Sequence, residues 1–107
     1  KEIGRMDIGQ TVVVKNKMIM AIEAIEGTDK AIKRGCQLGK KGSTVVKVSK
    51  PSQDQRFDIP VVGCKTLKNM KRYGADVLAI EANETLIVEE DKFVSIAKKL
   101  GISVIAI

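Results

Sequence analysis

Two short runs of the sequence gather the residue types that phosphoryl chemistry needs. In the first, Lys50-Pro-Ser-Gln-Asp-Gln-Arg-Phe-Asp58, two carboxylates, Asp54 and Asp58, stand four positions apart around Arg56. Carboxylates can hold Mg²⁺ or its waters, an arginine can bind phosphate oxygens through two parallel hydrogen bonds, and a lysine adds a point charge. The run predicts a site for a phosphorylated ligand. The alternative is a structural loop in which Arg56 pairs with Asp58.

The second run, Glu23-Ala-Ile-Glu-Gly-Thr-Asp29, places three carboxylates between an expected strand and an expected helix. The first N–H groups of a helix are unpaired and carry partial positive charge, which suits a phosphate. Strand parity sends Glu23 and Glu26 to opposite faces unless the chain turns at Gly27. The alternative is that Thr28 or Asp29 caps the helix and that the glutamates are solvated.

Two smaller polar groups add candidates. Gln10 follows Gly9 near Asp7, and Glu81 opens the run Glu81-Ala-Asn-Glu84 after an apolar strand. Carboxyl ends of sheet strands are favoured ligand positions in α/β proteins. For residues 81–84, however, a surface turn accounts for the sequence more simply.

The elements that must position these residues follow from periodicity and turn signals. The two-residue spacer Asn16-Lys17 between extended runs predicts a hairpin. Two later helices each end at a glycine, Gly74 or Gly101, and continuous apolar strands follow them, which predicts strands buried on both faces. The order ββαβαββαβ predicts an α/β domain with a mixed sheet and about three packing helices. The expected strands are 11–15, 18–25, 44–48, 77–80, 85–88 and 102–107, and the expected helices run from 28 or 29 to 39, through 67–73 and through 93–100.

The domain organisation is simple. Residues 1–10 are expected to be a linker or the start of a domain, and residues 11–107 a single domain. The stretch 49–65, which contains Pro51 and Pro60, fits neither a helical nor an alternating pattern and is expected to be an ordered functional loop. A chain that begins at Lys1 suggests a piece of a longer protein.

Composition excludes several function classes. The 107 residues contain no histidine, which rules out Ser-His-Asp and Cys-His sites within this chain. The net charge of +6 suits anionic partners, but Phe57, Tyr73 and Phe93 are the sole aromatic residues, so a nucleic-acid binder is not expected. Cys36 and Cys64 fit reduced thiols of a cytoplasmic protein. No apolar run reaches membrane-spanning length.

Four segments together resemble the carboxyl-terminal domain of the LpxI-type UDP-2,3-diacylglucosamine pyrophosphatases. The resemblance extends over nearly the whole chain in order, and the longest segment resembles a KPxQDxRFDxPxxG motif. The segments are Asp7–Val14, Ala21–Asp29, Val46–Gly63 and Gly74–Glu81. The resemblance implies an enzyme of lipid A biosynthesis in which water attacks the α-phosphate of UDP-2,3-diacylglucosamine with the help of Mg²⁺. It also implies an absent amino-terminal domain, a site between the two domains, a homo-oligomer, and a cytoplasmic location with peripheral contact at the inner membrane.

The same resemblance assigns expected roles to individual residues. The expected catalytic residues are Asp54, Asp58 and Arg56. Substrate contacts are expected from Gln53, Lys50, Thr28, Asp29 and Gln10, and Mg²⁺ ligands are expected among Asp54, Asp58, Glu23 and Glu26. Two other functions stay open: a non-catalytic module that binds the lipid substrate or forms a dimer, and a basic domain that binds polyanions.

Overall fold

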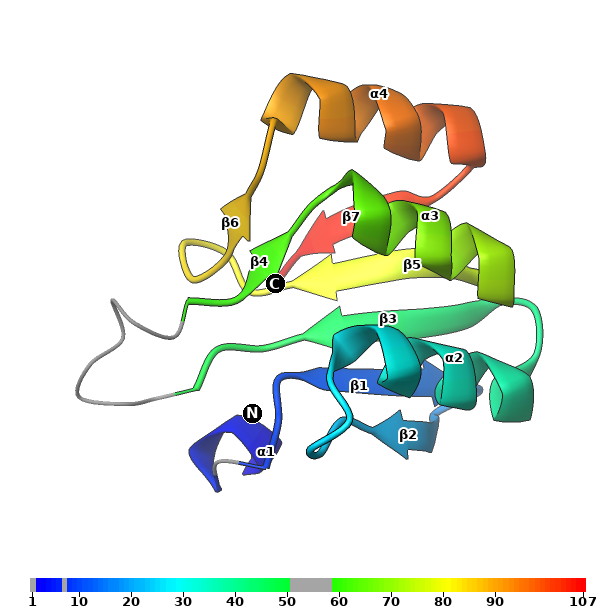
Figure 1. Cartoon of the computed structure of the whole chain (residues 1–107), viewed down its shortest axis with the longest axis vertical. Coiled ribbons are helices and arrows are strands. Elements are labelled where there is room, and N and C mark those ends of the chain that lie inside the picture. The colour runs from blue at the N-terminus through cyan, green and yellow to red at the C-terminus, as the bar shows by residue number, and fades with distance from the viewer. Residues whose placement is uncertain (1, 7, 51–58) are drawn as a thin grey trace.

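The computed structural model describes residues 2–6, 8–50 and 59–107. In this part of the chain, helices and strands alternate in an α/β arrangement (Figure 1). The helices are α1 (Glu2–Arg5), α2 (Thr28–Gly39), α3 (Cys64–Tyr73) and α4 (Glu90–Leu100). The strands are β1 (Thr11–Lys15), β2 (Met18–Ile22), β3 (Ser43–Lys47), β4 (Val61–Val62), β5 (Ala75–Ile80), β6 (Leu86–Ile87) and β7 (Ser103–Ala106).

The main sheet has the strand order β2-β1-β3-β5-β7. Strand β1 is antiparallel to both β2 and β3, whereas β3, β5 and β7 are parallel. The expected α/β domain with a mixed sheet and three main packing helices is therefore confirmed. A second, two-stranded sheet pairs β4 with β6, so the expected strand at 85–88 lies outside the main sheet.

Helices α2, α3 and α4 pack side by side, and they lie against one face of the main sheet (Figure 1). The cause is topological. The crossovers β2-α2-β3, β3-α3-β5 and β5-α4-β7 all proceed in the same direction across the sheet, and right-handed crossovers in one direction place their helices on one face.

The opposite face of the sheet carries an uncharged row of side chains. Val12, Val46, Ala79 and Ile105 are neighbours in register, and no helix of the described residues covers them. The prediction that the last strand is buried on both faces is therefore wrong, since Ile105 is 47% exposed. The apolar run 102–107 correctly predicted burial on the sheet face that the helices cover. It wrongly predicted burial on the opposite face.

Helix α2 approaches β1 unusually closely. Its buried stripe includes Ile32, Gly35, Cys36 and Gly39. A Cβ atom at Gly35 would lie 2.4 Å from the Cβ of Val13, so only glycine permits this contact. The glycine that weakens the expected helix is thus required by packing.

Local signals explain the turns. Asn16 and Lys17 both have positive φ, as a two-residue hairpin turn requires, and the predicted hairpin is confirmed. Gly74 and Gly101 are left-handed caps that end α3 and α4. Cys36 is buried, and both it and Cys64 are free thiols, as expected.

Both ends of the described chain lie at the same edge of the sheet. Residues 2–5 form α1, where a Cβ at Gly4 would stand 2.5 Å from the carbonyl oxygen of Ser49. At the other end, Ile107 donates its N–H to the carbonyl of Ile80 and accepts from the N–H of Ala82. Among the described residues, no helix is long and apolar enough to cross a membrane.

Candidate functional site

Polar side chains from four separate elements meet at one edge of the main sheet. Thr11 begins β1 and stands opposite Lys47, which ends β3. Glu23 directly follows β2, and Thr28 begins α2 at the same edge. This edge holds the carboxyl ends of the parallel strands, where α/β proteins commonly bind ligands.

The hydroxyl of Thr28 is the centre of this group. Lys47 Nζ donates a hydrogen bond to Thr28 Oγ1 at 3.1 Å. Thr28 Oγ1 donates to Glu23 Oε2 at 3.5 Å and lies 3.3 Å from the hydroxyl oxygen of Thr11. We call Thr11, Glu23, Thr28 and Lys47 the edge network. It joins a cation, two hydroxyls and a carboxylate from β1, β2, β3 and α2.

The edge network is largely shielded from water. Thr11 is fully buried and Lys47 is 6% exposed. Burial lowers the pKa of Lys47, while the negative charges of Glu23 and Asp29 act in the opposite direction. Asp29 also forms an ion pair with Lys65 at 3.4 Å, which links the start of α2 to the start of α3.

The expectation that Thr28 or Asp29 caps α2 is wrong. The helix is capped by Gly27, whose φ is 89°, and no side chain forms a capping hydrogen bond. The Thr28 hydroxyl is already engaged within the edge network, and Asp29 faces Lys65.

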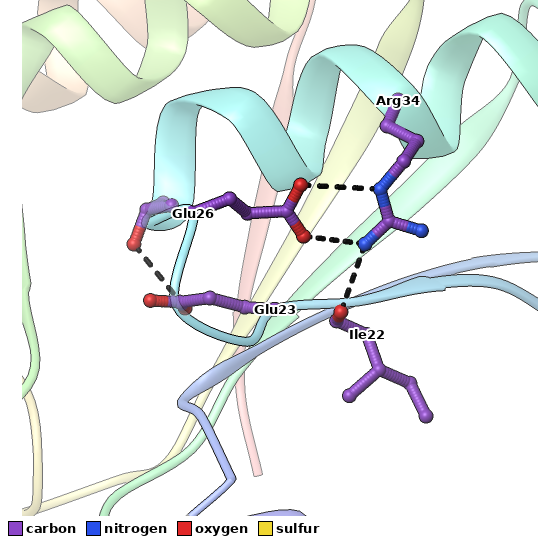
Figure 2. A network of polar contacts seen from close by, with 5 residues as sticks. Ile22, Glu23, Glu26 and Arg34 are labelled. Carbon is purple, nitrogen blue, oxygen red and sulfur yellow. Dashed lines mark hydrogen bonds and ion pairs between the residues drawn. The ribbon is translucent and has the colours of Figure 1, made fainter.

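Glu23 and Glu26 point to different partners. Figure 2 shows Glu26 turned toward Arg34, whose Nε donates to Glu26 Oε2 at 3.2 Å and whose Nη2 bonds the other carboxylate oxygen. Arg34 Nη2 also donates to the carbonyl of Ile22 at 2.9 Å. The hydrogen bonds from Arg34 lower the pKa of Glu26. The structure therefore brings Glu23 and Thr28 together and directs Glu26 to the flank of α2.

Glu81 lies beside the edge network along the same edge of the sheet. Its side chain is 5% exposed, and Oε1 accepts from the N–H of Ser49 at 2.7 Å and from its hydroxyl at 3.3 Å. The surface-turn interpretation holds for Ala82 and Asn83, which are exposed, and is wrong for Glu81. Glu81 anchors the chain just after β3.

Comparison with known proteins gives the family. A family model described as the LpxI C-terminal domain matches residues 1–105. This chain belongs to the LpxI C-terminal domain family. The UDP-2,3-diacylglucosamine pyrophosphatase LpxI of Caulobacter vibrioides is 33% identical over 115 residues, which cover 100% of this chain and 41% of that protein. The chain thus spans about two fifths of the length of this relative, and the resemblance inferred from the four segments is confirmed.

The expected site residues of this LpxI domain divide into two sets. Thr28, Asp29 and Glu23 meet at the edge, and the half-buried residues Gln10 and Lys50 stand close to it in the chain, next to Thr11 and Ser49. Among the described residues, Glu26 is instead turned toward Arg34. The remaining four expected residues lie outside the described residues; they are Gln53, Asp54, Arg56 and Asp58. Within the described ranges, no three acidic or cysteine side chains form a group that could hold a metal ion. The expected Mg²⁺ site stays a prediction, because Asp54 and Asp58 lie outside the described residues.

Sequence reasoning missed Lys47 and Thr11 in this LpxI domain. The sequence contained one signal, which is that Lys47 falls on the same side of strand β3 as Val45. In the structure Ser43, Val45 and Lys47 are all buried on that side. A lysine at the third position of a buried alternating face is unusual, since lysines are rarely buried without a partner.

Proposed function

We propose that this LpxI domain is the carboxyl-terminal part of an enzyme that hydrolyses UDP-2,3-diacylglucosamine to UMP and 2,3-diacylglucosamine 1-phosphate in lipid A biosynthesis. The edge network carries this proposal. A buried ammonium held by the Thr28 hydroxyl at the ligand-binding edge of an α/β sheet is suited to the negative charge of a diphosphate. The family of the chain supplies the class of substrate.

The roles divide between the edge network and the segment after β3. In this proposal Asp54 and Asp58 hold Mg²⁺ or orient the attacking water, Arg56 binds phosphate oxygens, and Gln53, Lys50, Gln10 and Asp29 contact the substrate. Mg²⁺, when bound, would neutralise charge on the diphosphate. Glu23 and Glu26 are not assigned to the metal here, because Thr28 and Arg34 engage them.

The proposal includes a second part of the site. Because the chain spans 41% of its relative, we infer that an amino-terminal domain completes the site and that substrate binds between the two domains. The enzyme would act in the cytoplasm as a homo-oligomer and meet its lipid substrate at the inner membrane. The domain alone is therefore expected to fold without appreciable pyrophosphatase activity.

The test is UMP release by the full-length enzyme. Asp54→Ala or Asp58→Ala should lower kcat about a hundredfold, the usual scale for a group that positions a metal or a nucleophile. Lys68→Ala and Lys99→Ala, both at exposed positions, should keep the wild-type rate. A wild-type enzyme that releases no UMP would refute the function. Two Asp variants with normal rates and lower melting temperatures would refute the site.

The uncovered sheet face favours one other candidate function. At its carboxyl end there is a groove of about 440 Å³, lined by Val46, Val48, Glu81, Ala82, Glu84 and Ile107. Such a surface suits a module that binds lipid or a second copy while another domain performs the chemistry. In that case Asp54→Ala would leave UMP release unchanged, whereas Val46→Asp would weaken lipid binding or dimer formation.

A further inference from the structure

Lys47 is a buried cation that the described fold leaves incompletely bonded. A lysine ammonium has three N–H donors. Among the described residues, Thr28 Oγ1 is the sole hydrogen-bond acceptor of Lys47, and the charges of Glu23 and Asp29 act on it without a hydrogen bond. In a site of low dielectric constant, an ammonium with unused donors binds an oxyanion strongly.

The burial of Lys47 is not required for packing. Val45 occupies the equivalent position two residues earlier on the same face of β3 and is fully buried. An apolar residue at position 47 would continue this surface without the desolvation of a charge. Burial lowers the pKa of Lys47, because desolvation disfavours the charged form.

Thr28 fixes the direction of the ammonium. Its hydroxyl can donate to Glu23 Oε2, which leaves an oxygen lone pair free to accept from Lys47. Thr11, which is fully buried, stands 3.3 Å from the same oxygen. The bond to Thr28 therefore places Lys47 Nζ within a buried group of hydroxyls.

We propose that Lys47 binds the phosphoryl oxygens of the substrate and that Thr28 is the positioning residue that orients its ammonium. This inference rests on the proposed function, and it adds a residue that the motifs of the sequence did not indicate. It assigns to Lys47 the fixed positive charge of the reaction site, which acts together with any bound metal ion.

The experiment compares Lys47→Met and Lys47→Arg with wild type in the full-length enzyme. Lys47→Met keeps the length of the side chain and removes the charge, so kcat/KM for UMP release should fall at least a hundredfold while the melting temperature stays the same or rises. Lys47→Arg should recover at least tenfold of that loss. Thr28→Val should raise KM by about tenfold. Lys68→Met, on the exposed face of α3, is the matched control and should behave as wild type.

A binding measurement separates this inference from the proposed function. Titration with inorganic diphosphate should show binding to wild type and at least tenfold weaker binding to Lys47→Met. A wild-type protein that binds diphosphate through Lys47 and releases no UMP would refute the function and leave the anion site standing. The inference is wrong if Lys47→Met retains diphosphate affinity and kcat/KM, or if its losses accompany a lower melting temperature that Lys47→Arg does not restore.

Discussion

Gly35→Ala tests the contact that places α2 against β1. The new methyl carbon would lie 2.4, 2.6 and 2.7 Å from three side-chain atoms of Val13, whereas carbon atoms in contact are normally about 3.5–4.0 Å apart. Either α2 or Val13 must move by about an ångström. Because Thr28 lies on the same stripe two turns earlier, such a shift would also lengthen its 3.3 Å contact with Thr11.

The size of the effect follows from two opposing contributions. Overpacking a core costs about 1–3 kcal/mol, and this position is at the upper end because three atoms clash. Replacing glycine by alanine within a helix recovers about 1 kcal/mol. The net loss should be about 1–2 kcal/mol, which corresponds to a melting temperature lower by about 5–15 °C in a domain of this size.

The assay is urea unfolding of the domain followed by circular dichroism, with Gln37→Ala as the exposed control on the same helix. The double variant Gly35→Ala/Val13→Ala removes two of the three close contacts. Its loss of stability should therefore be smaller than the sum of the two single losses by at least about 0.5 kcal/mol. Additive losses, or a Gly35→Ala variant as stable as wild type, would refute the close approach of α2 to β1.

Two further predictions concern buried charges. Because burial lowers the pKa of Lys47 from 10.5, the unfolded chain holds more protons than the folded one between that lowered pKa and 10.5, so the free energy of unfolding should rise with pH in this window. The measurement is urea unfolding of wild type and Lys47→Met at several pH values, with Glu23 and Asp29 unchanged. The difference in their free energies of unfolding should show this rise, and a difference independent of pH would contradict the prediction. Glu81→Ala should lower the free energy of unfolding by about 2–4 kcal/mol because two donors of Ser49 lose their acceptor. Glu81→Gln, which keeps an acceptor oxygen, should lose less, and equal losses would show that the hydrogen bonds are not the cause.

The sequence predicted the hairpin and the three main helices well because their signals are local. It missed α1 within residues 1–10, and it missed β4 and the first turn of α3 within the expected loop 49–65. Asn16-Lys17 determines the hairpin, and Gly74 and Gly101 end their helices through backbone conformations that glycine favours. The edge network could not be predicted in the same way. Thr11 and Lys47 are neighbours because β1 and β3 pair antiparallel, and that pairing depends on the strand order of the whole sheet.

The capping prediction failed for a related reason. A threonine at a helix start normally has no better acceptor or donor than the backbone of its own first turn. Here the fold brings Lys47, which is 19 positions away in the sequence, to the Thr28 hydroxyl, and Glu23 accepts from the same hydroxyl. The helices lie on only one face of the sheet because all three crossovers run in the same direction. The apolar pattern of a single strand could not predict this arrangement.

The position of the two chain ends governs how the domain can be attached to anything else. Since α1 contacts Ser49 and Ile107 bonds to Ile80 and Ala82, a fluorescent protein or surface anchor joined at Glu2 or Ile107 would stand at the edge of the sheet where the parallel strands end. The turn at 40–42, between α2 and β3, lies at the opposite edge of the sheet and is exposed. A label carried there would stand at the edge of the sheet opposite to Lys47, which ends β3.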